Sequence, residues 1–404
     1  MPGQADYADT GTDELMESLL FSPLSIRGLT LRNRIVLSPM LTYAATNGYT
    51  NDTHLAHLAK FAVGGAGLVF VESTKIDPRG CSTPRDLGLW KDEFIPGMRR
   101  IVDLVKSYGA ACGIQLGHSG RKARRSVPWE GRIPLRDVPG VDHGEPWELI
   151  APSAVAHDGN YQSPREMTHA DIAGMVEAWS QGARRAGEAG FDVMEIHGAH
   201  GYLIHQFLSA TANRRTDQYG GTLANRMRFA VEVVRGVRCC WPAHKPLFLR
   251  VSAVDETGWT IEDSVALAHT LGEHGVDVID CSAGGMSDAQ PAANPVCYGY
   301  QVKYAQAVRH GSGVKTMAVG MIVHADQAEA ILRAGDADLV ALGREYLVNP
   351  NWPLDAALKL GVATPYAQLP PVFGHYLGRR QRSFAGLRNS TWQSGIKDES
   401  GRER

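Results

Sequence analysis

Two histidines and a tyrosine stand close together in one stretch of the chain, Phe191–Tyr202. The stretch begins as a short apolar run of strand length, and His197, His200 and Tyr202 then follow within six residues. The glycine after each histidine permits a tight turn because glycine tolerates positive φ, so the two imidazoles can converge on one small anion or carbonyl oxygen. Binding and catalytic groups concentrate on loops held by rigid scaffolds. We therefore interpret these residues as functional rather than as surface histidines and a packing tyrosine.

The elements that must position this stretch alternate between helices and strands. Amphipathic segments predict helices at Asp52–Val63, Ile95–Tyr108, Thr168–Ala189, Leu223–Cys239, Ile261–His274, Tyr300–His310 and Ala325–Ala334. Short apolar runs rich in valine and isoleucine predict eight buried strands, at Ile35–Met40, Gly67–Thr74, Cys112–His118, Val193–His197, Leu247–Ser252, Val276–Ser282, Thr316–Met321 and Leu339–Gly343. Such alternation indicates a parallel sheet. Eight units match an α/β fold of the closed (β/α)8 TIM barrel type better than an open doubly wound sheet, whose Gly-x-Gly-x-x-Gly signal does not follow the first strand.

Three segments do not fit the alternation. Residues 1–19 form a polar lead, and residues 20–28 predict a hairpin or lid at the bottom of a barrel domain that spans residues 20–360. Residues 121–165 carry prolines, tryptophans and glycines and follow the third strand, so we expect them to pass over the barrel mouth. Residues 361–404 are expected to form a C-terminal extension that is partly extended, partly disordered or in contact with a neighbouring subunit.

Composition argues against several classes of function. The 404 residues carry a net charge of −2 with mixed signs, which gives no electrostatic reason for nucleic acid or an anionic membrane as partner; the basic run Arg121–Arg125 is expected to be a solvated face. No apolar run is long enough to cross a bilayer, and the start lacks the pattern of a secretory signal. The six cysteines lack the paired spacing of a zinc or iron–sulfur site. We therefore expect no metal and a cytoplasmic location.

Polar side chains and glycines collect where the predicted strands end, which is where barrels of this type carry function. After strands seven and eight, Gly320 and Gly343-Arg344 offer backbone N–H groups and a guanidinium that suit a phosphate. The other half suits a flat heteroaromatic ring, since Gln115 offers a donor and an acceptor and Arg250 would stabilise a ring that takes up electrons. The alternative for Arg250 is a salt bridge inside the barrel top. Other strand-end residues are Pro39, Met40, Tyr43, Ser73, His118, Ser282, Gly284 and Gly285.

The sequence carries a joint set of motifs at Leu31–Met40 with Tyr43, Gly113–Lys122, His197–Tyr202, Asn213–Gly221 with Asn225-Arg226, and Leu342–Glu345. Together they resemble the Old Yellow Enzyme family, and its thermophilic-like branch in particular, over about residues 20–360. The resemblance implies a TIM barrel with bound FMN that takes hydride from NADPH or NADH and passes it to the activated C=C bond of an enone-type small molecule. It also implies a homo-oligomer, either a dimer or a tetramer, in which Tyr376, Arg379 or Arg380 could reach a neighbouring site.

The same resemblance assigns roles to residues. His197 and His200 would hold the carbonyl oxygen of the substrate, Tyr202 would protonate the α-carbon on the face opposite the hydride, and Tyr43 would lie over the substrate as a second phenol. FMN would be bound by Pro39, Met40, Leu41, Ser73, Gln115, Arg250, Gly284 and Gly285, with Gly320, Gly343 and Arg344 on its phosphate.

Leu41 departs from the family pattern, in which this branch has cysteine and the classical branch has threonine. Because leucine cannot donate a hydrogen bond to the flavin edge, we expect a lower flavin potential. The departure leaves other functions open for the same FMN barrel: a dehydrogenase or isomerase, a nitro or quinone reductase, or a flavin-binding module without catalysis.

Overall fold

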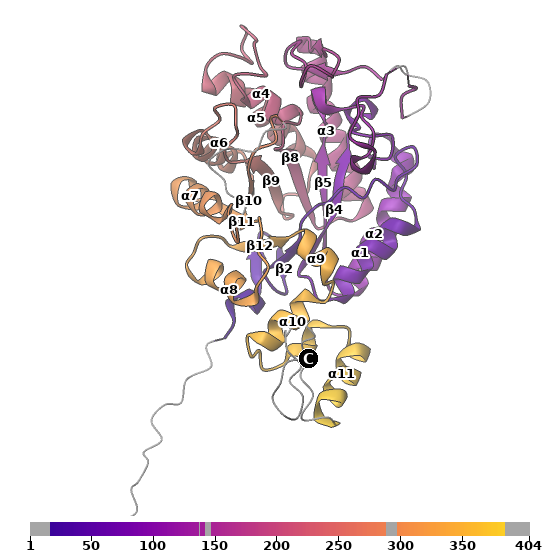
Figure 1. The fold of residues 1–404 in the computed structure, drawn as a ribbon, viewed down its shortest axis with the longest axis vertical. Helices are drawn as coiled ribbons and strands as arrows, with labels where there is room; N and C mark the ends of the chain where they lie inside the picture. The colour runs from indigo at the N-terminus through magenta and orange to yellow at the C-terminus, as the bar shows by residue number, and fades with distance from the viewer. Residues whose placement is uncertain (1–16, 137, 142–146, 288–296, 384–404) are drawn as a thin grey trace, which may run out of the picture.

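The centre of the protein is a closed barrel of eight parallel strands (Figure 1). The computed structural model describes residues 17–136, 138–141, 147–287 and 297–383. Around the barrel the order is β10 (Val278–Ser282), β11 (Lys315–Ala318), β12 (Leu339–Leu342), β3 (Ile35–Leu37), β4 (Leu68–Lys75), β5 (Ala111–Gly117), β8 (Val193–Gly198) and β9 (Leu247–Ser252). The predicted TIM barrel is confirmed. The first strand ends earlier than predicted, at Leu37, shortly before Pro39, which has no backbone N–H for the sheet.

The lower half of the barrel interior is filled with apolar side chains. Val36, Leu68, Phe70, Val193, Phe248, Val278, Met317 and Leu339 form one buried cluster with Ile26 and Leu31. The last two belong to a hairpin of β1 (Leu24–Ile26) and β2 (Leu29–Leu31). Of the predicted hairpin or lid, the hairpin is what forms, and its second strand lies beyond the predicted residues 20–28. Because this end is closed by hydrophobic packing, polar chemistry is confined to the opposite, carboxyl-terminal end of the strands.

Helices surround the barrel and bury their apolar faces against the outside of the strands. They are α1 (Asp52–Val63), α2 (Ile95–Ser107), α3 (His169–Ala189), α5 (Leu223–Cys240), α6 (Ile261–Glu273), α7 (Val302–Ser312) and α8 (Ala325–Arg333). Side-chain caps set several starts: Thr168 and Asp171 form a reciprocal capping box at α3, and Thr260 and Asp263 form one at α6. None of the helices in the described ranges is long and apolar enough to span a bilayer.

The segment between β5 and α3 folds over the barrel mouth, as predicted. It contains the 3₁₀ turns η4 (Gly120–Lys122) and η5 (Pro128–Glu130) and the short strands β6 (Ile150–Ala151) and β7 (Arg165–Glu166). Lys122 Nζ donates to the carbonyl oxygens of His200, 3.1 Å away, and Gly285, 2.7 Å away. These bonds tie the segment to the loops that follow β8 and β10.

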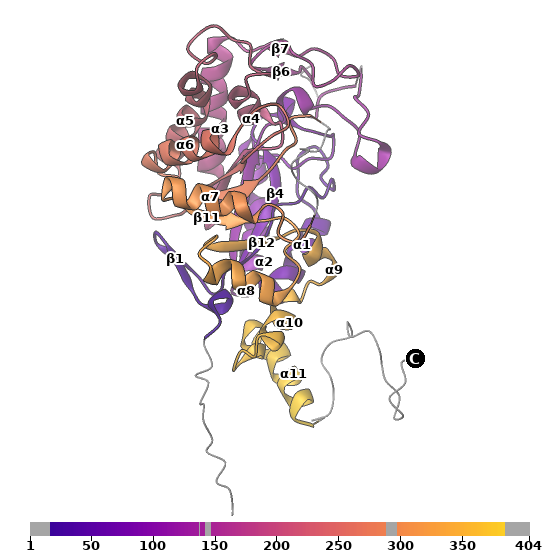
Figure 2. The same cartoon turned by 60° about the vertical axis from the view of Figure 1, so that its left-hand side comes forward.

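The C-terminal extension is more helical than the sequence suggested. After α9 (Arg344–Val348) and α10 (Trp352–Lys359), the chain forms η6 (Pro365–Gln368) and α11 (Pro371–Ser383). The prediction of an extended tail missed α11 because that helix buries none of its residues, so its apolar positions show no core period. Figure 2 shows α11 at the end of the molecule opposite β6 and β7. The predicted disordered end falls in residues 384–404, and most of the polar lead in residues 1–16; both lie outside the described residues.

Candidate active site

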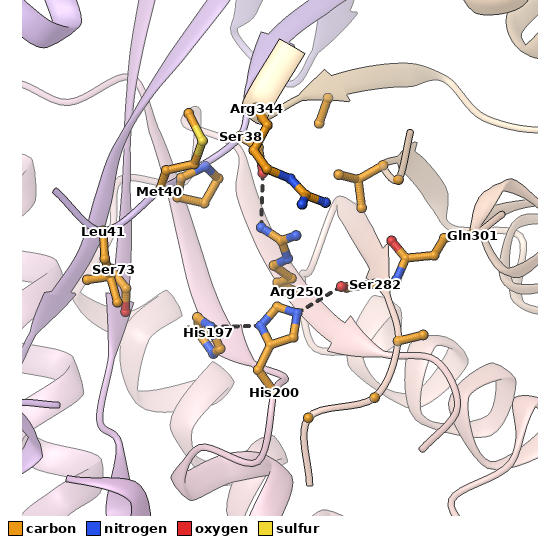
Figure 3. Close-up of a pocket in the computed structure, with 18 of the residues that line it drawn as sticks. Ser38, Met40, Leu41, Ser73, His197, His200, Arg250, Ser282, Gln301 and Arg344 are labelled. Atoms are coloured by element: carbon orange, nitrogen blue, oxygen red, sulfur yellow. Dashed lines mark hydrogen bonds between the residues drawn. The ribbon is translucent and has the colours of Figure 1, made fainter. Parts of the chain in front are cut away.

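A cavity of about 820 Å³ lies at the carboxyl-terminal end of the barrel strands (Figure 3). Its volume falls in the range of small-molecule and cofactor sites. The structure brings all the predicted site residues to its walls: Pro39, Met40, Leu41, Tyr43, Ser73, Gln115, His197, His200, Tyr202, Arg250, Gly284, Gly285, Gly320, Gly343 and Arg344. Their individual roles stay predictions. His118 is not among the lining residues; it is buried, and its Nδ1 accepts a hydrogen bond from the Gly120 N–H.

The two histidines converge as the spacing predicted. His197 Nε2 lies 3.3 Å from His200 Nδ1, and His200 Nε2 lies 2.8 Å from Ser282 Oγ, as the dashed lines in Figure 3 show. The turn uses left-handed backbone at His200 (φ +58°) and Gly201 (φ +71°). A Cβ on Gly201 would lie 2.3 Å from the Gly285 carbonyl oxygen, so only glycine fits there. Gly198, also expected to help the turn, instead ends strand β8.

Both imidazoles are neutral donors near neutral pH. Burial is the main reason that the pKa of His197 lies well below its usual range, with a smaller contribution from His200. Burial likewise lowers the pKa of His200, and the charge of Arg250 adds to the effect. The Ala199 N–H faces His197 Nδ1 at 3.4 Å, so the proton of this ring resides on Nε2. His197 Nε2–H can then donate to His200 Nδ1 across the 3.3 Å contact, which leaves the proton of His200 on Nε2, facing Ser282 Oγ. Each neutral ring thus has one N–H group to offer a carbonyl oxygen.

Tyr202 is buried beside the histidine pair, and its ring stacks on His197 with centroids 4.7 Å apart. Burial alone would raise the pKa of the Tyr202 phenol, but the positive charges of Lys75, Arg125 and Lys122 outweigh it and lower the pKa. Lys75 Nζ lies 4.9 Å from the ring centroid. The second phenol at the cavity, that of Tyr43, differs from Tyr202, since burial raises its pKa. The more acidic one, Tyr202, is the better proton donor.

The cations around Tyr202 were missed by sequence reasoning. The prediction that the run Arg121–Arg125 forms a solvated face is wrong. Arg121, Lys122 and Arg125 are each less than one-tenth exposed. The long segment over the mouth covers them, which no local pattern reveals. Lys75 is fully buried, donates to Ser73 Oγ at 3.1 Å and lies 3.6 Å from an Asp86 oxygen. A lysine at the end of a fully buried strand was the available signal.

Arg250 lies at the centre of the cavity floor. Its Nη1 donates to Ser38 Oγ at 3.0 Å, and its Nε lies 3.2 Å from an Asp280 oxygen, so the alternative of a salt bridge inside the barrel top is also realised. Nε makes no hydrogen bond with proper geometry among the described residues. A second buried carboxyl, Glu195, has its pKa raised first by burial and then by Asp280, and it pairs with Gln115 at 2.8 Å. Burial also raises the pKa of Asp280, and the charge of Arg250 opposes that rise. The Arg250 guanidinium keeps donor capacity toward the cavity.

The far end of the cavity suits a phosphate. Gly320 has φ +111°, and a Cβ there would lie 2.7 Å from Gln301 Oε1. At Gly343 the closest atom to an added Cβ would be Met40 Sδ at 3.6 Å, so the backbone there is open to an approaching group. Arg344 is exposed at the same end. Bare backbone and a guanidinium at one end, with Arg250 and Gln115 at the other, fit a phosphate-bearing ring cofactor such as FMN.

Gly285 has a second structural task. A Cβ on it would lie 2.7 Å from His200 Cα, so glycine is required for the loop after β10 to support the histidine turn. Leu41 is held at the cavity wall by its neighbour: Thr42 donates from its backbone N at 2.7 Å and from Oγ1 at 2.6 Å to the carboxylate of Glu72. Glu72 in turn faces His54 Nε2 at 3.3 Å. The loop that carries Leu41 is therefore fixed from below.

Comparison with known proteins decides the family. Residues 19–361 match the model of the NADH:flavin oxidoreductase / NADH oxidase family. The chain belongs to this family. It is 46% identical over 350 residues to an NADPH dehydrogenase of Geobacillus sp. (strain WCH70), a match that covers 86% of this chain and 96% of that protein. The predicted membership of the Old Yellow Enzyme family is confirmed.

Solved structures agree with this family. Morphinone reductase superposes with a TM-score of 0.70 at 27% identity, covering 86% of this chain and 91% of that one. A 2-naphthoyl-CoA reductase superposes with a TM-score of 0.75 at 24% identity; because this chain spans 53% of that larger protein, the likeness shows the barrel alone. This flavin oxidoreductase is therefore an NAD(P)H-dependent enzyme that uses FMN.

Proposed function

We propose that the enzyme reduces the activated C=C bond of α,β-unsaturated carbonyl compounds. The observation that carries the proposal is the pairing of two neutral imidazoles, 3.3 Å apart, with a phenol whose pKa is lowered. This arrangement suits a reaction in which negative charge develops on a carbonyl oxygen while a proton is delivered to carbon. Similarity to an NADPH dehydrogenase and to morphinone reductase supports a reduction driven by a nicotinamide cofactor.

The residues of the chain divide the work as follows. His197 and His200 bind the carbonyl oxygen, which draws electrons from the β-carbon and stabilises the enolate charge that develops. FMN, when bound, would supply the hydride. Tyr202 then gives its proton to the α-carbon, and Lys75 and Arg125 stabilise the phenolate that remains. Protein donors in a buried site act strongly because water does not compete with them.

FMN itself would be bound along the cavity floor. We assign Pro39, Met40, Leu41, Ser73, Gln115 and Arg250 to its ring and ribityl chain, Gly284 and Gly285 to its neighbourhood, and Gly320, Gly343 and Arg344 to its phosphate. Tyr43 would lie over the substrate. Its raised pKa suits a phenol that remains protonated and contributes a hydrogen bond rather than a proton.

An anaerobic titration tests the reaction. NADPH should bleach the enzyme, and cyclohexenone added afterwards should restore the yellow colour and yield cyclohexanone. A nitroester and a quinone serve as competing acceptors, which cover the alternative of a nitro or quinone reductase. If the bleached enzyme is reoxidised by the nitroester or quinone and not by cyclohexenone or a maleimide, the proposed alkene reduction is wrong. If NADPH does not bleach it, a non-catalytic flavin module is indicated.

We also propose that the enzyme is a homo-oligomer, a dimer or tetramer, in which residues 361–404 contact a neighbouring subunit. The exposed apolar side chains of Val372, Phe373 and Tyr376 on α11 support such a contact. Light scattering measures the mass directly, and a monomer at micromolar concentration would contradict the proposal. The domain boundaries after residues 19 and 360 stay predictions, and so does the cytoplasmic location.

A further inference from the structure

We propose that the substrate side of the cavity holds a carboxylate through Arg125, so that the enzyme prefers α,β-unsaturated carbonyl substrates that carry a carboxylate group. The inference rests on the proposed function and specifies its substrate class. It starts from one side chain, Arg125, which lines the cavity and is 7% exposed.

The guanidinium of Arg125 has no carboxylate partner within the described residues. The groups that raise its pKa against the opposing effect of burial are three phenols, those of Tyr202, Tyr161 and Tyr43. Of these, Tyr161 contributes in two ways, through its charge and through its closeness as a hydrogen-bond acceptor. A phenol is neutral unless it gives up its proton, so these partners do not balance the charge. A buried cation without an anion is costly, which makes a bound anion the natural counter-charge.

The other buried cations of the same region differ from Arg125 in this respect. Arg121 donates to the carbonyl oxygens of Val155, Ala156 and Met286. Lys122 donates to two backbone carbonyls, and Lys75 lies 3.6 Å from Asp86. Their donors are directed at the protein. Arg125 lines the cavity, and no ion pair with a carboxylate is found for it among the described residues.

The charge of the surrounding wall points the same way. On the substrate side, Arg132 and Lys122 line the cavity in addition to Arg125. Among the described lining residues the one carboxylate is Glu345, next to Arg344 at the phosphate end. An anionic group near Tyr202 would therefore meet positive charge without an opposing carboxylate. Guanidinium is well suited to such a group because its planar fork pairs bidentately with a carboxylate.

A phosphate of NADPH could supply the same negative charge, so the test must separate the two sources. The substrates are 4-oxocyclohex-2-ene-1-carboxylate and its primary amide, which have the same reactive enone and differ in charge away from it. In the wild-type enzyme, kcat/KM for the carboxylate should exceed kcat/KM for the amide by at least about tenfold. That factor corresponds to the weakest hydrogen bonds that charged groups make in proteins. Arg125→Gln should bring this ratio close to one. Because Arg125 also acts on Tyr202, the rates with both substrates are expected to fall, and NADPH is common to both measurements, so the ratio of the two kcat/KM values is the readout.

Two variants control the comparison. Arg136→Gln removes one positive charge from the same segment at an exposed position that does not line the cavity, and it should keep the wild-type ratio. Arg125→Lys keeps the charge without the fork and should give an intermediate ratio; it replaces Arg125→Gln if that variant does not fold with FMN.

Ligand binding separates failure of this inference from failure of alkene reduction. Titration with 4-hydroxybenzoate and 4-hydroxybenzamide, followed by the absorption of the bound flavin, requires no turnover. Wild-type enzyme should bind 4-hydroxybenzoate at least about tenfold more tightly than 4-hydroxybenzamide. Arg125→Gln should bind the two ligands about equally. No preference in wild type, an equal loss for both ligands in Arg125→Gln, or an effect confined to NADPH would each overturn the inference. A preference that persists in an enzyme that reduces no enone would leave the carboxylate site standing and reject only the proposed reaction.

Discussion

Removal of either imidazole of the histidine pair should impair reduction of the substrate far more than binding of FMN. His197 and His200 are buried side by side, with ring nitrogens 3.3 Å apart, and each neutral ring has one N–H group to donate. Loss of one donor to a developing oxyanion costs about 3 kcal/mol, or about 100-fold to about 1,000-fold in rate. We expect that loss in kcat/KM for cyclohexenone in both His197→Ala and His200→Ala.

The assay follows the oxidative half-reaction of NADPH-reduced enzyme by stopped-flow absorption, so that the reduction of the flavin does not limit the rate. Titration with a phenol gives an independent measure, because a bound phenolate places its oxygen where the enolate oxygen would lie. Each single variant should bind the phenol more weakly and keep its FMN. Because both donors act on the same atom, the double variant should lose less than the product of the single losses.

A surface histidine provides the control. His169 on α3 has a side chain that is 61% exposed, and His169→Ala should change the rate less than about twofold. Since the pKa values of both active-site imidazoles lie well below their usual range, phenol binding should show no inflection near pH 6.5. Single losses below about fivefold with FMN retained would refute the oxyanion role, as would unchanged phenol titrations.

Three further predictions concern the proton donor and the flavin wall. Tyr202→Phe should keep reduction by NADPH at the wild-type rate but slow alkene reduction by about 100-fold to about 10,000-fold, measured in separate half-reactions; equal slowing of both would contradict the assignment. Lys75→Met removes a charge that lowers the pKa of Tyr202, so the pKa of that phenol should rise. The alkaline limb of the pH profile of kcat should then move to higher pH, and the rate at neutral pH should fall. An unmoved limb would show that Lys75 does not act through the phenol. Leu41→Cys adds a donor beside the flavin and should raise its midpoint potential in a potentiometric titration; a value at or below that of wild type would reject the effect expected for Leu41.

The fold was largely predictable because each barrel strand is a short buried run with its own local signal. The same holds for the residues at the strand ends, since a barrel brings those ends together whatever the loops do. His197, His200 and Tyr202 could be recognised because they are adjacent in sequence.

The electrostatic environment of Tyr202 could not be predicted from local sequence. Arg125 belongs to a run that resembles a solvated face, and it is buried because the long segment between β5 and α3 folds back over it. Lys75 interacts with Asp86 and with the ring of Tyr202, which is distant in sequence. Helix α11 was missed for the opposite reason: it buries no side chain, so it leaves no pattern of buried positions.

We propose that the cavity at the barrel mouth binds FMN. The direct test is to purify the protein under flavin-replete conditions, denature it, and identify and quantify the released yellow compound by mass and absorption. We expect FMN at close to one molecule per chain, with strong loss of the bound cofactor in Arg250→Ala. Colourless protein, or another flavin in place of FMN, would contradict it.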